Sequence, residues 1–243
     1  MKNEINLVID WIKNYVKNSG AKGVVVGNSG GKDSAVVIGL CAKALGKENV
    51  LAVSLPCNSI SEDLEDANLV ANTFMVNTLT IDLTKTYSIL SSNIEDVLSE
   101  KLIANSAINI SPRLRMTTLY AIAMQYGYLV VGTGNACEAF IGYTTKWGDN
   151  ASDFNPLAEF TVSEVLEMAK ILGIPDKIIN KAPNDGLGLG SDEEKLGITY
   201  REVEEYIKTG TTKNVNSCLK IEKLHKQSEH KRNKIPVYNR NLN

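Results

Sequence analysis

Residues 23–34 read GVVVGNSGGKDS, which joins an apolar run to a polar turn rich in glycine. The apolar residues 35–40 that follow are typical of the start of a buried helix. Small residues at such a junction let backbone N–H groups point inward, and the helix N-terminus adds partial positive charge. The stretch therefore predicts a strand, a turn and a helix that together form a cradle for phosphate groups.

Asp33 makes this loop unusual, because a carboxylate beside phosphates needs a cation between them. Mg²⁺ suits that place, since it takes oxygen ligands and binds phosphate. The common nucleoside-triphosphate loop has Ser or Thr after its Gly-Lys pair, whereas this chain has Asp33 there. The loop also lacks the G-x-G-x-x-G pattern, so a nicotinamide-dependent hydride-transfer enzyme is not indicated. The alternative is a glycine turn with an acidic helix cap and no ligand.

Length and composition indicate one globular domain over residues 1–243. Of the 243 residues, 43% are hydrophobic, which is enough for one core. A net charge of −2 disfavours nucleic acid as the main partner. Four widely spaced cysteines and two histidines predict neither a zinc site nor a disulfide framework, and they fit a reducing compartment.

The first residues predict an amphipathic helix, because apolar side chains recur at helical spacing between residues 5 and 16. Glu4 and Asp10 within it argue against a signal peptide. No apolar run approaches the roughly 20 residues that span a bilayer. We therefore expect a soluble, cytoplasmic protein without a membrane partner.

Apolar runs alternate with helical patterns along the first half of the chain. Strands are expected at 24–27, 50–55, 77–81 and 128–133, and helices near 33–46, 61–74 and 113–126. This order predicts an α/β fold with a doubly wound, mostly parallel sheet. Capping boxes at residues 161–164, 191–194 and 199–202 predict a helical C-terminal portion.

A second strand, glycine turn and helix start lies at residues 128–138 and ends on Glu138. Ligands of such sheets bind beyond the carboxyl ends of the strands, so Asp33 and Glu138 can face one site. Two carboxylates that converge on a triphosphate can hold Mg²⁺. The alternative is that Glu138 only favours the helix dipole.

Three further segments carry polar side chains suited to a ligand. The loop 142–153 is long and glycine-punctuated and offers Lys146 and Asp153, although an ordinary solvated loop fits equally well. Arg113 and Arg115 open a helix on different sides, so one can bind phosphate or carboxylate while the other makes a structural ion pair. The basic tail 220–234, with His230, is either a solvated face or a cover for a polyanion.

Together these segments resemble the ammonia-dependent NAD synthetase family, a branch of the ATP pyrophosphatases with their S-G-G-x-D-S loop. The resemblance runs from about residue 23 to residue 236. Its most specific block is GYTTKWGDNASDFNPL at residues 142–157, and RLRM at 113–116, SDEEKLGITY at 191–200 and EHKR at 229–232 follow the family's order. The resemblance implies a Rossmann-like fold of the adenine nucleotide alpha hydrolase type.

The resemblance also implies a reaction and a set of site residues. ATP adenylates the pyridine carboxylate of deamido-NAD, ammonia displaces AMP, and NAD, AMP and pyrophosphate are the products. Mg²⁺ would be held by Asp33 and Glu138, and a homodimer is expected. The ATP-binding residues would be Gly27, Asn28, Ser29, Gly30, Gly31, Lys32, Asp33, Ser34, Thr133 and Asn184. The deamido-NAD-binding residues would be Arg113, Lys146, Asp153, His230 and Lys231, with Lys146 also counted as catalytic beside Asp33 and Glu138.

Two positions depart from the family pattern, since Val162 stands where a lysine that contacts ATP is common, and Asn184 where Ser or Thr is common. ATP affinity can be lower for that reason, or a neighbouring lysine can compensate. The chain shows no glutaminase pattern, so we expect free ammonia or a separate protein that supplies it. The alternatives are another ATP pyrophosphatase, such as a tRNA-thiolating enzyme or GMP synthetase, and a nucleotide-sensing module that has lost turnover.

Overall fold

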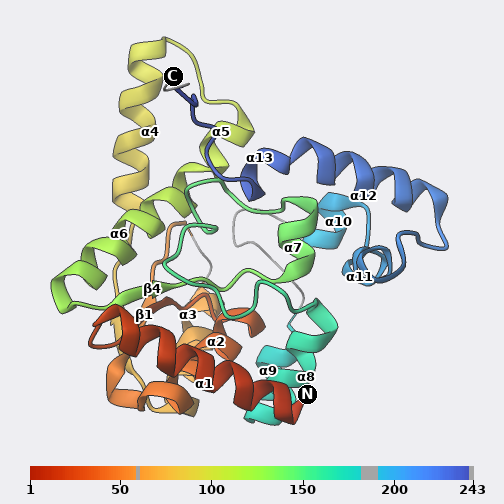
Figure 1. The fold of residues 1–243 in the computed structure, drawn as a ribbon. Coiled ribbons are helices and arrows are strands. Elements are labelled where there is room, and N and C mark those ends of the chain that lie inside the picture. Colours follow the sequence, from red (N-terminus) through yellow and green to blue (C-terminus); the bar gives the residue numbers. More distant parts are fainter. Residues whose placement is uncertain (59–60, 182–190, 241–243) are drawn as a thin grey trace.

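The computed structural model describes residues 1–58, 61–181 and 191–240. Within these ranges a four-stranded parallel sheet runs through the centre of the protein, with helices on both faces (Figure 1). The strand order is β3-β2-β1-β4. The strands are β1 (Val24–Gly27), β2 (Val50–Ser54), β3 (Asn77–Thr80) and β4 (Leu129–Val131). The doubly wound α/β fold predicted from the sequence is confirmed.

Thirteen α-helices and one short 3-10 turn accompany the sheet in the described part of the chain. Those of the first half are α1 (Lys2–Ser19), α2 (Lys32–Leu45), α3 (Ser61–Phe74), α4 (Thr84–Leu98), α5 (Ala104–Ile108) and α6 (Ile110–Tyr126), with the turn η1 (Lys47–Asn49). Those of the second half are α7 (Ala136–Ile141), α8 (Val162–Leu172), α9 (Asp176–Ile179), α10 (Asp192–Leu196), α11 (Tyr200–Thr209), α12 (Val215–Gln227) and α13 (Glu229–Arg232).

The two faces of the sheet bury alternate residues of the same strands. Val24 and Val26 of β1 pack into a core shared with α1, α2 and α8, whereas Val25 packs against α6 on the opposite face. All three valines are fully buried. Burial on both faces explains why β1 reads as a continuous apolar run instead of an alternating one.

The second half of the chain forms a smaller helical cluster beside the sheet, as predicted. Helices α7, α11 and α12 meet around buried Cys137, Val203 and Ile221 (Figure 1). The capping boxes of α8, α10 and α11 are all present. Capping satisfies N–H groups that the first helical turn would otherwise leave unpaired.

The structure contains two helices that the sequence analysis did not predict, α4 and α5. Neither contains a fully buried residue, although Tyr87, Leu90, Ile94 and Leu98 of α4 recur at helical spacing. Helix α1 buries Ile5, Val8 and Ile12 against the core and leaves other apolar side chains, among them Leu7 and Trp11, exposed.

No helix in the described ranges is both long and apolar enough to cross a bilayer.

Candidate functional site

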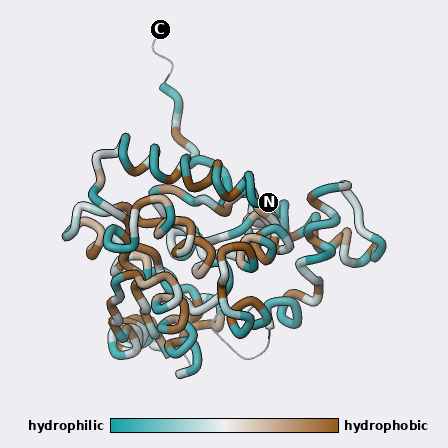
Figure 2. The backbone as a smooth tube through the Cα atoms, turned by 90° about the horizontal axis from the view of Figure 1, so that it is seen from below, coloured by the Kyte–Doolittle hydropathy of each residue, from teal (hydrophilic) through white to brown (hydrophobic). Residues whose placement is uncertain are grey.

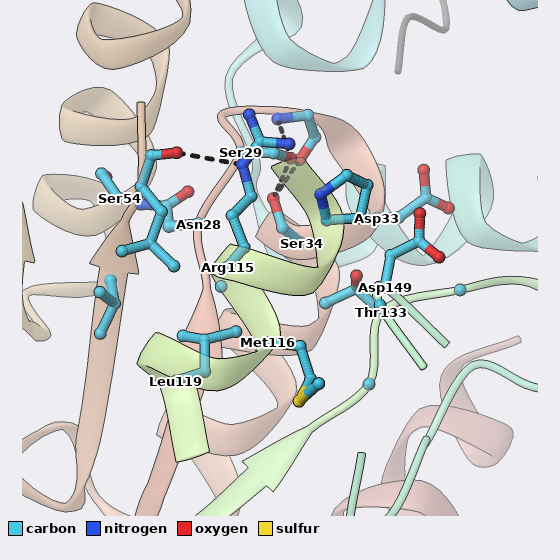
Figure 3. A pocket seen from close by; sticks show the side chains of 18 of the residues that line it. Asn28, Ser29, Asp33, Ser34, Ser54, Arg115, Met116, Leu119, Thr133 and Asp149 are labelled. Atoms are coloured by element: carbon cyan, nitrogen blue, oxygen red, sulfur yellow. Dashed lines mark hydrogen bonds between the residues drawn. The ribbon is translucent and has the colours of Figure 1, made fainter. Parts of the chain in front are cut away.

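A cavity of about 340 Å³ opens at the carboxyl ends of β1, β2 and β4 (Figure 3). The phosphate-type loop between β1 and α2 forms one wall, and the glycine turn after β4 forms another. In a sheet of this order, the crevice between β1 and β4 is the place where neighbouring crossovers turn in opposite directions and ligands bind. The fold therefore places the cavity where the sequence predicted a site.

The loop is shaped by its contact with α3. Gly30 has a φ of 75° and is packed so tightly that a Cβ there would lie 2.7 Å from the Asp63 carbonyl oxygen. The Asn28 side chain fixes the turn, because its Oδ1 accepts from the Gly30 N–H at 3.2 Å and its Nδ2 donates to the Ala67 carbonyl at 2.8 Å. A glycine is thus required by both the backbone angle and the lack of space.

The loop leads directly into α2, whose N-cap is Gly31. The Ser29 and Ser34 hydroxyls lie 3.1 Å apart, and both residues line the cavity. A helix N-terminus and two hydroxyls beside an open cavity are suited to bind an anion.

Asp33 and Glu138 line the same cavity, and the buried Asn135 joins them. The Asn135 Nδ2 donates to Asp33 Oδ1 at 3.1 Å. The Asn135 Oδ1 accepts from the Glu138 N–H, and the Asn135 N–H donates to Glu138 Oε2 at 3.0 Å. One amide therefore connects the phosphate loop to the cap of α7, a link between positions 102 residues apart in the chain.

The two carboxylates destabilise one another when both are charged. Removal from water, and then the neighbouring Asp33, raise the pKa of Glu138 to about 8. A carboxyl held close to a second one keeps its proton until a cation arrives. The pair thus has the chemistry of a site for a divalent cation with oxygen ligands, and the residues present fit Mg²⁺. Among the described residues, no group of three or more His, Cys, Asp or Glu side chains is placed to hold a metal ion.

Among the described residues that line the cavity, five carboxylates outnumber three cationic side chains. The acids are Asp33, Asp63, Glu138, Asp149 and Asp192, and the cations are Lys32, Arg115 and Lys181. A triphosphate is strongly anionic, so its binding here requires additional positive charge, in agreement with a metal-dependent nucleotide site.

Arg115, and not Arg113, reaches this cavity (Figure 3). The Arg115 Nε donates to the Leu55 carbonyl at 3.0 Å, which directs the guanidinium toward the loop. Arg113 is exposed and donates to the Lys146 carbonyl at 3.3 Å. The sequence showed that the two arginines point to different sides of the helix, but their tertiary neighbours decide which side faces the cavity.

Asp149 is a further cavity residue to which the sequence analysis gave no role (Figure 3). Its Oδ1 accepts from the Thr145 N–H at 2.6 Å, so the carboxylate braces the loop 142–153 from within. Its position seven residues after Gly142, in a segment already expected to be functional, is the signal that could have found it.

Four of the residues predicted to bind deamido-NAD cluster beside the cavity, although they are not among its lining residues. The Lys146 Nζ donates to the His230 carbonyl at 2.7 Å, and the Lys231 Nζ donates to the Gly142 carbonyl at 2.7 Å. With the contact between Arg113 and Lys146, these bonds tie the loop 142–153 to α6 and α13.

The other predicted residues lie in three different settings. Asp153 lies apart from that cluster, since its Oδ2 accepts from the Val130 N–H at 2.7 Å at the edge of β4. Thr133 lines the cavity. Val162 packs into the helical cluster of α7, α11 and α12. Asn184 lies outside the described residues.

The fold and the site define a class. The sheet is parallel, and its glycine loop carries one carboxylate that faces a second one in the cavity. This arrangement is typical of metal-dependent nucleotide-binding proteins of the adenine nucleotide alpha hydrolase-like type.

Comparison with known proteins identifies the family. The NAD synthase family model matches residues 4–235, and the chain belongs to this family of C–N ligases. An NH(3)-dependent NAD(+) synthetase of Carboxydothermus hydrogenoformans is 40% identical over 94% of this chain and 93% of its own.

Two solved structures are similar over nearly the whole chain. One is the NMN synthetase from Francisella tularensis, with a TM-score of 0.92, 34% identity and coverage of 98% of both chains. The other is the NH3-dependent NAD synthetase from Campylobacter jejuni, with a TM-score of 0.80, 29% identity and coverage of 98% of both chains.

Proposed function

We propose that the chain amidates the pyridine carboxylate of deamido-NAD with ammonia and ATP, and releases NAD, AMP and pyrophosphate. The observation that carries the proposal is the phosphate loop whose Asp33 faces Glu138 across one cavity. Membership of the NAD synthase family supports the same reaction.

The loop and its neighbours bind and orient ATP. The backbone N–H groups of residues 27–34 and the hydroxyls of Ser29, Ser34 and Thr133 would hold the phosphates, and Asn184 is proposed as a further ATP contact by family resemblance. Asp33 and Glu138 would hold Mg²⁺, which when bound neutralises the phosphates and the leaving pyrophosphate. A pyridine carboxylate oxygen then attacks the α-phosphorus, the bond from that phosphorus to the bridging oxygen breaks, and pyrophosphate leaves.

Ammonia completes the reaction without a covalent enzyme intermediate. It attacks the acyl carbon of the adenylate, AMP leaves with the oxygen that joined it to the acyl group, and nitrogen loses one proton. Cys137, which precedes Glu138 in the chain, is unsuited as a nucleophile, because burial raises its pKa to about 11. Catalysis therefore depends on positioning and on charge stabilisation.

The cluster beside the cavity is proposed as the nicotinate-nucleotide site. Arg113, Lys146, His230 and Lys231 gather cationic and polar groups next to the acidic cavity, and Asp153 lies at the end of the same loop. These groups suit the phosphates and hydroxyls of a dinucleotide.

Replacing Lys146 with alanine should raise the KM for deamido-NAD by about tenfold or more, since one charge-assisted hydrogen bond is lost. The KM for ATP should stay within twofold. Steady-state kinetics with each substrate varied in turn checks this, with the exposed Lys13→Ala on α1 as a control of equal charge change. A defect confined to ATP would reassign Lys146 to the nucleotide.

A second candidate substrate is the mononucleotide, nicotinate mononucleotide, because the structure similar at a TM-score of 0.92 is an NMN synthetase. The amidation chemistry is the same, and only the adenylyl half of the substrate is missing. Measuring kcat/KM for both nucleotides with Mg·ATP and ammonium tests the choice. We expect deamido-NAD to be preferred. A higher value for the mononucleotide would reassign the substrate, and ATP binding without turnover of either would indicate a nucleotide sensor.

We also propose a single domain that uses free ammonia or ammonia from a separate protein. The chain matches 93% of the length of an NH(3)-dependent relative, which supports the use of ammonia. A cytoplasmic location is proposed as well, in agreement with four free cysteines.

A homodimer is proposed because several large apolar side chains remain exposed. Val97 of α4, Ile103 before α5, and Met124 of α6 are 84%, 71% and 84% exposed. The tail that runs away from the helices adds Val237 and Tyr238, which are 73% and 92% exposed (Figure 2). Light scattering after gel filtration should give twice the mass of 26.5 kDa, and Val97→Glu with Met124→Glu should shift the mass toward the monomer.

A further inference from the structure

Lys32 lies at the point where the phosphate loop becomes a helix. It is the first residue of α2, directly after the N-cap Gly31. Its side chain is only 8% exposed and lines the cavity. The Nζ donates to Asp33 Oδ2 at 2.9 Å, which uses one of the three N–H donors of the ammonium group.

Helix geometry alone does not favour a lysine at this position. A cation in the first turn of a helix opposes the helix dipole, and burial of an ammonium group costs free energy unless a partner compensates. A side chain at the start of a helix leans back toward the N-terminus, so the ammonium group is directed at the loop and its cavity. Acidic neighbours, first Asp33 and then Glu138, compensate the buried cation, which also faces the cavity that would receive an anion.

Of the other two cavity cations, Lys181 is bound to carboxylates, and Arg115 uses its Nε–H on a carbonyl group while its guanidinium faces the loop (Figure 3). Arg115 bonds the Leu55 carbonyl through Nε, and Lys181 bonds both Asp63 and Asp66 at 2.9 and 2.6 Å. Lys32 contacts Asp33, and Glu138, the second carboxylate proposed to hold the metal, lies near this pair. Lys32 is therefore the cavity cation in direct contact with a carboxylate proposed to hold the metal.

We propose that Lys32 binds the pyrophosphate part of ATP, and that its ion pair with Asp33 is the resting arrangement that the nucleotide replaces. This rests on the proposed function and deepens it. When Asp33 turns to a metal ion, the ammonium group loses its partner and its donors become available to the β- and γ-phosphate oxygens. As the bond from the α-phosphorus to the bridging oxygen breaks, that oxygen leaves with the electron pair, and Lys32 stabilises the charge on the departing pyrophosphate.

The test measures binding, separately from turnover. Titration calorimetry at saturating Mg²⁺ compares Mg·ATP, Mg·pyrophosphate and AMP on the wild-type protein and on Lys32→Gln. We expect the variant to bind Mg·pyrophosphate and Mg·ATP at least tenfold more weakly, with AMP unchanged within twofold, and Lys32→Arg to bind all three within threefold of wild type. Lys43→Gln, on the exposed part of the same helix, is the control of equal charge change.

Two results would overturn the proposal. Unchanged or tighter binding of Mg·ATP to Lys32→Gln would mean that Lys32 only neutralises Asp33 and competes with the metal. Equal weakening of AMP would mean that the lysine supports the cavity as a whole. If wild-type protein binds Mg·pyrophosphate but amidates neither nucleotide, the proposed function fails while the role of Lys32 stands.

A measurement on the wild-type protein keeps the test decisive if Lys32→Gln does not fold. The ¹⁵N signal of the Lys32 ammonium group, assigned by its absence from Lys32→Arg, should shift on addition of Mg·pyrophosphate and stay in place with AMP. A signal that ignores Mg·pyrophosphate contradicts the proposal.

Discussion

Asp33→Asn should lower kcat by about 1,000-fold or more. This loss corresponds to about 4 kcal/mol of transition-state stabilisation, a size expected when a ligand of a charge-neutralising metal is removed from a phosphoryl-transfer site. The substitution keeps the shape of the side chain, and Oδ1 can still accept from Asn135 Nδ2, so the link to α7 is preserved. The measurement is the rate of AMP formation from Mg·ATP with deamido-NAD and ammonium.

The same variant separates metal binding from nucleotide binding. With EDTA present, Asp33→Asn should bind ATP no more weakly than wild type, because one carboxylate that repels the phosphates is gone. Asp10→Asn, on the exposed face of α1, gives the same charge change away from the cavity. A kcat within tenfold of wild type for Asp33→Asn would remove Asp33 from the metal site.

Glu138 should make the stability of the ligand-free protein fall as pH rises toward 8. Its pKa is about 8 in the folded protein and near the ordinary 4.5 when unfolded. Between these values the folded state binds more protons than the unfolded state, so its stability is greatest below about pH 4.5, declines as pH rises, and levels off above about pH 8. Other groups add their own dependence, and the effect of Glu138 is therefore read from a difference between variants.

Glu138→Gln removes this titration. We expect its Tm to exceed that of wild type by more than about 4 °C at pH 8, and the gap to shrink toward pH 5.5. Glu4→Gln, on exposed α1, is the matched control. Magnesium and ATP together should stabilise wild type more at pH 8 than at pH 6, because the metal binds the deprotonated carboxylate. Parallel Tm curves for wild type and Glu138→Gln would contradict the account of the pair.

Most of the fold was predictable because its signals are local. The run Val24–Gly27 was identified by its apolar residues and the turn after it by its glycines, and β1 has the predicted bounds. Glu138 was placed beside Asp33 by a topological rule, since the carboxyl ends of parallel strands share one edge. Helix α4 was missed although its apolar residues Tyr87, Leu90, Ile94 and Leu98 recur at helical spacing.

The parts of the site that the sequence did not reveal depend on contacts between distant segments. Asn135 lies within the segment 128–138 that the sequence analysis singled out, but its bond to Asp33 exists only when two strand ends meet. The choice between Arg113 and Arg115 depends on where Leu55 lies. The family resemblance gave Lys32 only as one residue of the ATP-binding loop, and its burial against Asp33 gave its side chain a specific role to test.

The most direct test of the account follows an oxygen atom. Deamido-NAD labelled with ¹⁸O in its pyridine carboxylate is converted with Mg·ATP and ammonium, and the AMP is analysed by mass spectrometry. The account predicts one ¹⁸O atom in each AMP, since the carboxylate oxygen that attacks the α-phosphorus stays with it, and one pyrophosphate per NAD formed. Unlabelled AMP, or ADP and phosphate as products, would contradict adenylation of the carboxylate in this cavity.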